Sequence, residues 1–266
     1  MQKLVLHPEN NKSGFTTITA RGFAARIFNV VLGCGLLLVA VPAMTAERPD
    51  FTGVWGVYRD PGQPAPVFGA PPPELPLTPP AKLKVDAYRA LVAPNGDNPG
   101  GFCLGTGMPG SMLGSGGYPM EIVQRDDIIL VVYEAHGEIR RIYLNLRVAE
   151  EDLFPDRNGY SIGRWEGNKL IVETTHLKEA VDQMRYPHSA NARIVEEYEL
   201  GTGADGGKIL IAHMTMTDPE FFTETIKTDK KWAYLPNTRL LPYECNEPTW
   251  EEHLEHLKLQ QSGDAK

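Results

Sequence analysis

Short β-rich runs follow one another closely from Tyr118 onward, and this succession constrains the fold more than any other feature of the chain. Breaks such as Arg125-Asp126-Asp127 are short enough for hairpins. The expected strands cover 51–58, 120–124, 128–135, 139–144, 160–165, 169–175, 193–200, 208–217, 221–228, 232–234 and 239–245. Strands without intervening helices predict an antiparallel meander, and a sheet of about ten strands closes into a barrel or folds into a sandwich. We predict a mainly β protein whose meander closes into a barrel.

The remaining segments are expected to decorate this barrel. Residues 61–80 are dense in proline and predict an extended excursion, whereas 81–92 have helical spacing. We therefore divide the mature chain into a Pro/Gly-rich segment with the first strand and one helix (47–117), a barrel (118–248), and a C-terminal helix with a tail (249–266).

The first 46 residues are typical of an export signal. Two arginines precede an apolar run over 27–44, and small residues lead to a cleavage position after Ala46. Two alternatives are a retained membrane anchor and a lipoprotein modified at Cys34. The prediction is a periplasmic or secreted protein with no membrane contact beyond a possible N-terminal anchor.

Charge and cysteine content fit this location. The formal net charge is −8, and the export segment removes more basic than acidic residues, which argues against nucleic acid as a partner. Of the three cysteines, Cys103 and Cys245 remain after export. In an oxidising compartment we predict a disulfide between them, with two separate buried thiols as the alternative.

The opening of the first strand, Phe51-Thr-Gly-Val-Trp55, resembles that of lipocalin-type barrels. The resemblance implies a tryptophan that closes one end of the barrel and a cavity for a small hydrophobic molecule. The chain departs from that pattern in its proline-rich insertion and lacks a clear second lipocalin motif near its end.

A larger part of the chain is similar to a group of exported bacterial proteins of unassigned function. The shared stretches are Tyr118–Gln124, Glu138–Tyr143, Gly159–Gly167 and Pro187–Ser189. This resemblance spans most of residues 50–245 and implies a location and a β-rich fold, but no chemistry.

No motif predicts a metal or a cofactor. His253 and His256 are spaced for one face of a helix, but no third ligand follows nearby. The glycine-rich stretches lack the lysine of a phosphate-binding loop, and no nucleophile motif is present.

Charged residues on the central strands are candidates for a ligand site. Strand alternation places Arg140 and Arg141 on opposite faces, so at most one points inward. A buried arginine requires a carboxylate, for which Glu121 and Glu134 are the natural candidates. Tyr133 lies beside them near the end of its strand. A structural ion pair is the alternative interpretation.

His188 is the candidate general base, because it lies in a loop that enters a strand and histidine titrates near neutral pH. Glu196 on the following strand could orient it, and Arg140 could stabilise an anionic intermediate. His213 and Trp165 are further candidate ligand contacts. The alternatives are a surface-loop position for His188 and core positions for the other two.

These observations predict an exported barrel that binds a small apolar or aromatic molecule in a central cavity. The first alternative is a cofactor-independent lyase, isomerase or hydrolase that acts on such a molecule. The second is an envelope-associated interaction protein that docks through its proline-rich segment. The oligomeric state stays open.

Overall fold

The computed structural model describes residues 48–63, 74–114, 117–182, 186–243 and 248–264. The predicted export segment and Cys245 lie outside these residues, so the signal and the Cys103–Cys245 disulfide stay predictions. None of the helices in the described segments combines the length and the apolar character that a membrane crossing requires.

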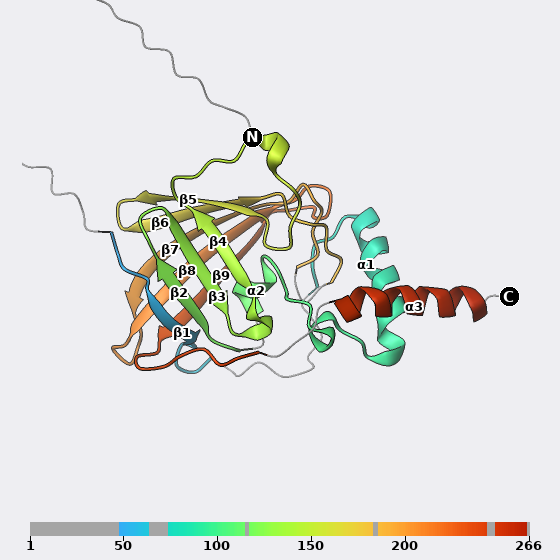
Figure 1. The fold of residues 1–266 in the computed structure, drawn as a ribbon, viewed down its shortest axis with the longest axis horizontal. Helices are drawn as coiled ribbons and strands as arrows, with labels where there is room; N and C mark the ends of the chain where they lie inside the picture. Colours follow the sequence, from blue (N-terminus) through green and yellow to red (C-terminus); the bar gives the residue numbers. More distant parts are fainter. Residues whose placement is uncertain (1–47, 64–73, 115–116, 183–185, 244–247, 265–266) are drawn as a thin grey trace, which may run out of the picture. The chain divides into compact units, whose positions relative to one another are not determined.

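Nine strands form a closed barrel (Figure 1). They are β1 (Gly53–Val57), β2 (Met120–Gln124), β3 (Ile128–Tyr133), β4 (Ile139–Tyr143), β5 (Tyr160–Glu166), β6 (Lys169–Thr175), β7 (Arg193–Thr202), β8 (Lys208–Thr217) and β9 (Ile226–Tyr234). Each strand pairs with its neighbours in chain order, and β1 closes the ring by pairing with both β2 and β9. The predicted mainly β, meander-like barrel is confirmed.

Three details differ from the prediction. The β4 and β5 strands run parallel, because the long connection over 144–159 returns the chain to the starting end before β5 begins. The predicted strands 221–228 and 232–234 are largely one strand, β9, whose ladder with β8 continues through Asp229, Lys230 and Lys231. These three polar residues indicated a turn in the sequence, but in the structure they belong to the strand and pair with β8. Residues 239–243, the described part of the last predicted strand, form no strand.

Alternation along the strands builds the core. In β3, Ile129, Val131 and Tyr133 are buried while the residues between them are half-buried. Trp55 in β1 is fully buried and belongs to the same hydrophobic cluster. Its indole Nε1 donates to the carbonyl oxygen of Phe51 at 2.8 Å, so the one polar atom of the ring is satisfied.

The helices are α1 (Pro79–Val92), α2 (Gly110–Gly114) and α3 (Pro248–Asp264), with short 3₁₀ turns η1 (Ala93–Asn95), η2 (Pro99–Phe102), η3 (Ala135–Gly137) and η4 (Glu150–Asp152). Helices α1 and α3 lie next to each other at one side of the barrel (Figure 1). Helix α1 begins after Thr78, whose hydroxyl accepts from the Ala81 amide. The sequence predicts a loop where α2 lies, but Met112 of this helix is buried in the core.

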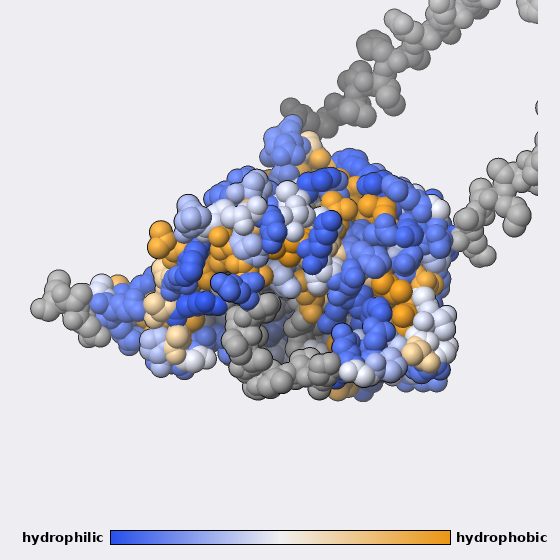
Figure 2. All heavy atoms as spheres, turned by 180° about the vertical axis from the view of Figure 1, so that it is seen from behind, coloured by the Kyte–Doolittle hydropathy of each residue, from blue (hydrophilic) through white to orange (hydrophobic). Residues whose placement is uncertain are grey.

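Helix α3 docks on η2 through aromatic side chains. The ring of Phe102 stacks on His253 with centroids 4.3 Å apart and lies 4.8 Å from Trp250, which is buried. His253 Nε2 lies 2.7 Å from an Asp97 carboxylate oxygen. His253 therefore belongs to a helix contact. On the face seen in Figure 2, hydrophilic residues predominate and hydrophobic residues form separate patches.

Candidate functional site

His188 lies in the loop between β6 and β7, at the barrel end where β6 finishes and β7 starts. Its main chain forms a two-way bridge with Ala180: the Ala180 amide donates to His188 at 3.0 Å, and the His188 amide donates back at 2.8 Å. The residue is only 2% exposed. The surface-loop alternative is therefore wrong, because His188 lies in a loop but is buried.

The orientation of the His188 ring is set by a main-chain oxygen. Nδ1 lies 2.8 Å from the carbonyl oxygen of Tyr186. Because a carbonyl oxygen can only accept, Nδ1 carries a proton, and Nε2 is the acceptor nitrogen of the neutral ring. Glu196, the predicted orienting residue for His188, lies inside the barrel and is bound by Arg140.

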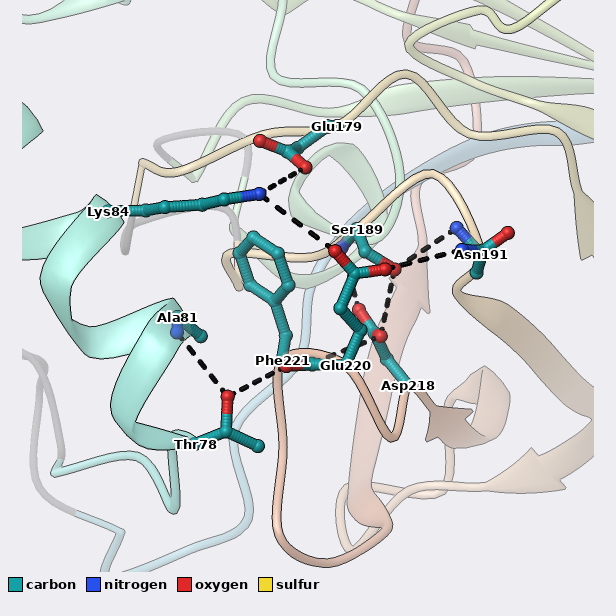
Figure 3. Close-up of polar contacts among 9 residues, drawn as sticks. All are labelled: Thr78, Ala81, Lys84, Glu179, Ser189, Asn191, Asp218, Glu220 and Phe221. Atoms are coloured by element: carbon teal, nitrogen blue, oxygen red, sulfur yellow. Dashed lines mark hydrogen bonds and ion pairs between the residues drawn. The ribbon is translucent and has the colours of Figure 1, made fainter.

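The segment that follows His188 is held by a buried carboxylate (Figure 3). Asp218 accepts from the Ser189 amide at 2.7 Å and from the Ser189 hydroxyl at 2.9 Å, and both residues are buried. Lys84 of α1 reaches the same region, where it bonds Glu179 at 2.8 Å and lies 3.9 Å from Glu220. Loop and helix are therefore fixed to each other around His188.

A pocket of about 150 Å³ opens beside His188. Its apolar wall includes Met108 and Trp250, both buried, which come from the segment before α2 and from α3. Its charged lining comes from the barrel loops and α3: Arg157, Lys178, Glu179, Asp182 and Glu251. The pocket thus combines a buried apolar and imidazole wall with charges of both signs.

A second pocket of about 420 Å³ lies away from His188 and includes Trp165, one of the predicted ligand contacts. Gln124, Arg125 and Thr52 contribute to its lining, together with other polar residues. The Trp165 ring is half-buried and packs against Phe51 with centroids 5.4 Å apart. Neither pocket includes Arg140 or Glu196.

The barrel interior holds a buried polar network around Arg140, which is fully buried, as is Glu196. The guanidinium binds both carboxylate oxygens of Glu196, with Nη1 2.9 Å from Oε1. It also donates to Thr174 at 2.8 Å and to Ser161 at 3.1 Å. Tyr198 donates to Glu196 at 2.7 Å. The bidentate ion pair is therefore satisfied by protein groups on four strands.

The electrostatics of this network favour fixed protonation states. Burial is the largest single effect on Arg140 and opposes its charge, but the charge and hydrogen bond of Glu196, together with Tyr198 and Tyr133, outweigh it and raise the pKa of the guanidinium. Burial also raises the pKa of the Tyr198 hydroxyl, and the charge of Glu196 adds to this effect. The pKa of Tyr133 is raised mainly by burial. At neutral pH the arginine keeps its charge and both tyrosines keep their protons.

The other predicted contacts lie apart from this network. Arg141 is exposed on the outer face of β4, as alternation required once Arg140 points inward. The partner of Arg140 is neither Glu121 nor Glu134: Glu121 is half-buried on β2, and Glu134 accepts from the Leu241 amide at 2.7 Å. Glu121 lies on the face of β2 opposite the buried Met120 and Ile122, and Glu134 follows the end of β3, whereas Glu196 points inward from β7 and meets the guanidinium.

The prediction that His213 contacts a ligand or lies in the core is wrong. Its side chain is 47% exposed and bonds Asp229 on the neighbouring strand at 2.7 Å. The adjacent Ala212 and Met214 are buried, so alternation turns His213 to the outside. It lies neither in the core nor in a cavity, because the apolar residues around it in sequence belong to the opposite face.

Sequence reasoning missed Lys230, whose side chain points inward from β9 and donates to the carbonyl oxygen of Leu113 at 2.9 Å. The sequence predicted a break between two strands at this position, so the direction of the Lys230 side chain could not be predicted. Only a continuous strand places residues 228, 230 and 232 on one face. It also missed Met108 and Trp250, because the pocket forms from segments distant in the chain.

Among the described residues, no cluster of His, Cys, Asp and Glu has the arrangement of a metal site. A comparison of the chain with models of known protein families finds no match, and a comparison with curated protein sequences finds none either.

Proposed function

We propose that this protein binds a small organic molecule with an aromatic or apolar body in the pocket beside His188. The observation that carries the proposal is the pocket itself, about 150 Å³ in volume, with buried Met108, Trp250 and His188 in its wall. A cavity of this size suits a single aromatic ring, and polar groups that converge beside an apolar wall are typical of ligand sites.

The proposed ligand lies at the end of the barrel and not at its centre. The barrel interior is occupied by the hydrophobic cluster around Trp55 and Met214 and by the Arg140–Glu196 pair. Charged residues in the lining of this pocket would bind a polar substituent of the ligand. They are the basic Arg157 and Lys178 and the acidic Glu251. Export to the periplasm or medium remains part of the proposal.

Substituting Ala180 by phenylalanine is expected to abolish binding, because the larger side chain fills the pocket that Ala180 lines. Saturation-transfer NMR with phenol, benzoate and benzylamine measures binding of a neutral, an anionic and a cationic ring. We expect transfer to at least one of them with a dissociation constant of about 1 mM or lower in the unmodified protein. Thr52→Phe, in the second pocket, is the matched control.

Transfer to none of the three rings would contradict the proposal, as would transfer that Ala180→Phe leaves unchanged. Loss of transfer in Thr52→Phe alone would place the ligand in the pocket beside Trp165. Circular dichroism of both variants verifies that each retains the fold.

The tautomer of His188 favours a second candidate function, general-base catalysis on the bound molecule. With Nδ1 bonded to a carbonyl oxygen, Nε2 is the ring nitrogen that would accept a proton from the bound molecule. The expected reaction classes are those of a cofactor-independent lyase, isomerase or hydrolase. The interaction-protein alternative depends on the proline-rich segment, of which 64–73 lie outside the described residues.

If the protein is such a hydrolase, His188→Gln lowers its hydrolysis of 4-nitrophenyl acetate by about 10²-fold or more, since a positioned base contributes a factor of that order. His213→Gln is the control, because it also replaces a histidine, but one that lies on the outer surface and lines neither pocket. Equal rates for the His188 variant and the unmodified protein would contradict a role as base, while leaving ring binding intact.

A further inference from the structure

The carboxylate of Glu138, directly before β4, is the centre of a group of hydrogen bonds. Its Oε1 accepts from the Gly107 amide at 3.0 Å and from the Asn158 side-chain amide at 3.0 Å, and its Oε2 accepts from the Ser111 hydroxyl. Ser111 is only 1% exposed, and Glu138 is half-buried. Three donors from distant parts of the chain therefore converge on one carboxylate.

The main chain on both sides of Thr106 follows this carboxylate closely. Gly105 is buried, and a Cβ atom there would lie 3.0 Å from the carboxyl carbon of Glu138. Gly107 has a φ of +64°, in the left-handed region, and a Cβ atom there would lie 2.5 Å from the carbonyl oxygen of Arg157. Glycine is therefore the residue that fits on either side of Thr106 while the chain passes this close to Glu138.

Thr106 extends the network to the pocket beside His188. Its hydroxyl oxygen lies 2.8 Å from that of Ser111. Thr106 is half-buried and belongs to the lining of the pocket, as does Met108 two residues further on. A line of two hydroxyls thus leads from a carboxylate at one end to the wall of a cavity at the other.

The number of protons fixes the direction of each hydrogen bond in this line. A hydroxyl has one proton, and Ser111 gives its proton to Glu138. Towards Thr106 the serine oxygen can then only accept, so the Thr106 hydroxyl donates to Ser111. Thr106 has no proton left for the pocket and can only accept there. Hydrogen bonds in series polarise one another, so the carboxylate strengthens Thr106 as an acceptor.

We propose that the ligand bound beside His188 is an aromatic ring that carries a hydrogen-bond donor, with phenol as the simplest example, and that Thr106 selects this donor. The inference rests on the proposed ring-binding function and specifies its ligand class. The ring would lie against Met108 and Trp250, and its hydroxyl would donate to the Thr106 oxygen. A substituent that can only accept would meet the lone pairs of the threonine.

Thr106→Val tests the selection, because valine has the shape of threonine but no hydroxyl. The full chain is titrated with phenol and with toluene, which carries a methyl group in place of the hydroxyl, and saturation-transfer NMR measures both dissociation constants. We expect Thr106→Val to weaken binding of phenol relative to toluene by about three- to tenfold, the factor that one hydrogen bond contributes.

Two further variants are the controls. Thr106→Ser keeps a hydroxyl at this position and should keep the phenol-to-toluene ratio of the unmodified protein. Thr52→Val makes the same substitution in the second pocket and should also leave the ratio unchanged. Circular dichroism verifies the fold of each variant.

The possible failures of the inference and of the proposed function can be told apart. A ratio that Thr106→Val leaves unchanged would overturn the inference while ring binding stands. Failure of phenol and toluene to bind would also overturn the inference, and failure of benzoate and benzylamine as well would overturn the proposed function. In the unmodified protein, benzoate that binds as tightly as phenol would contradict the selection of a donor without any variant.

Ser111→Ala tests the direction of the hydrogen bonds without altering the residues that line the pocket. Thr106 then loses the group to which it donates, so its proton can point into the pocket. Binding of benzaldehyde, whose oxygen can only accept, should therefore improve relative to phenol by about the same factor. An unchanged ratio of benzaldehyde to phenol binding would overturn the proposed direction and with it the selection by Thr106.

Discussion

Replacing Glu196 with alanine is expected to lower the free energy of unfolding by about 3–5 kcal/mol, because the fully buried Arg140 then keeps its charge without a counterion. The remaining hydroxyls of Ser161 and Thr174 donate or accept single hydrogen bonds but carry no charge to offset the guanidinium. Equilibrium unfolding in urea, followed by tryptophan fluorescence, measures the loss.

Two control variants accompany Glu196→Ala. Substituting both Arg140 and Glu196 by methionine should be less destabilising than Glu196→Ala alone, because no uncompensated charge is left. Glu197→Ala breaks an ion pair with Lys169 on the outer face, where water already solvates both side chains, and should have only a small effect. If Glu196→Ala lowered the free energy of unfolding as little as Glu197→Ala does, the Arg140 side chain would have to reach solvent in the variant, and the prediction would be contradicted.

Trp55→Ala is expected to lower the free energy of unfolding by about 3–5 kcal/mol, since it removes a fully buried tryptophan from the point where β1 pairs with β2 and β9. The indole packs edge-on against Tyr234 with centroids 5.3 Å apart. Its loss therefore leaves a cavity beside the strand pair that closes the ring. Urea unfolding again measures the change.

Trp55→Phe tests the contribution of the indole hydrogen bond to stability separately from that of ring packing. It retains most of the buried area but loses the bond from Nε1 to Phe51, and we expect a smaller loss of about 1–2 kcal/mol. Equal losses in the two variants would mean that the hydrogen bond, and not the packing of the indole, dominates. That outcome would contradict the expectation that the ring stabilises the barrel mainly by filling space.

The strands were largely predictable because their residues alternate between two environments. The ranges 120–124, 169–175 and 208–217 are predicted and observed alike, since each carries β-branched or apolar residues at every second position. In β9 the signal failed: Asp229, Lys230 and Lys231 are typical of a turn, although pairing with β8 satisfies their backbone.

The polar network shows where alternation stops being informative. Strand alternation predicts that Arg140 and Arg141 lie on opposite faces of β4, and this is observed. It does not say which carboxylate meets Arg140, because that depends on the register of four strands and on the parallel β4–β5 pair. The pocket beside His188 was even less predictable, since α3 and the segment before α2 reach it from distant parts of the chain.

The pairing of β1 with β9 also governs how the barrel can be made. Trp55 lies opposite Tyr234, roughly 180 residues away, so the contact order is high and closure is expected to be slow. During synthesis the β1 edge has no β9 to pair with until nearly all of the chain has emerged. Until then β1 and the last completed strand present unpaired amides and carbonyls that can recruit other chains. A chain that stops short of β9 would keep those edges open.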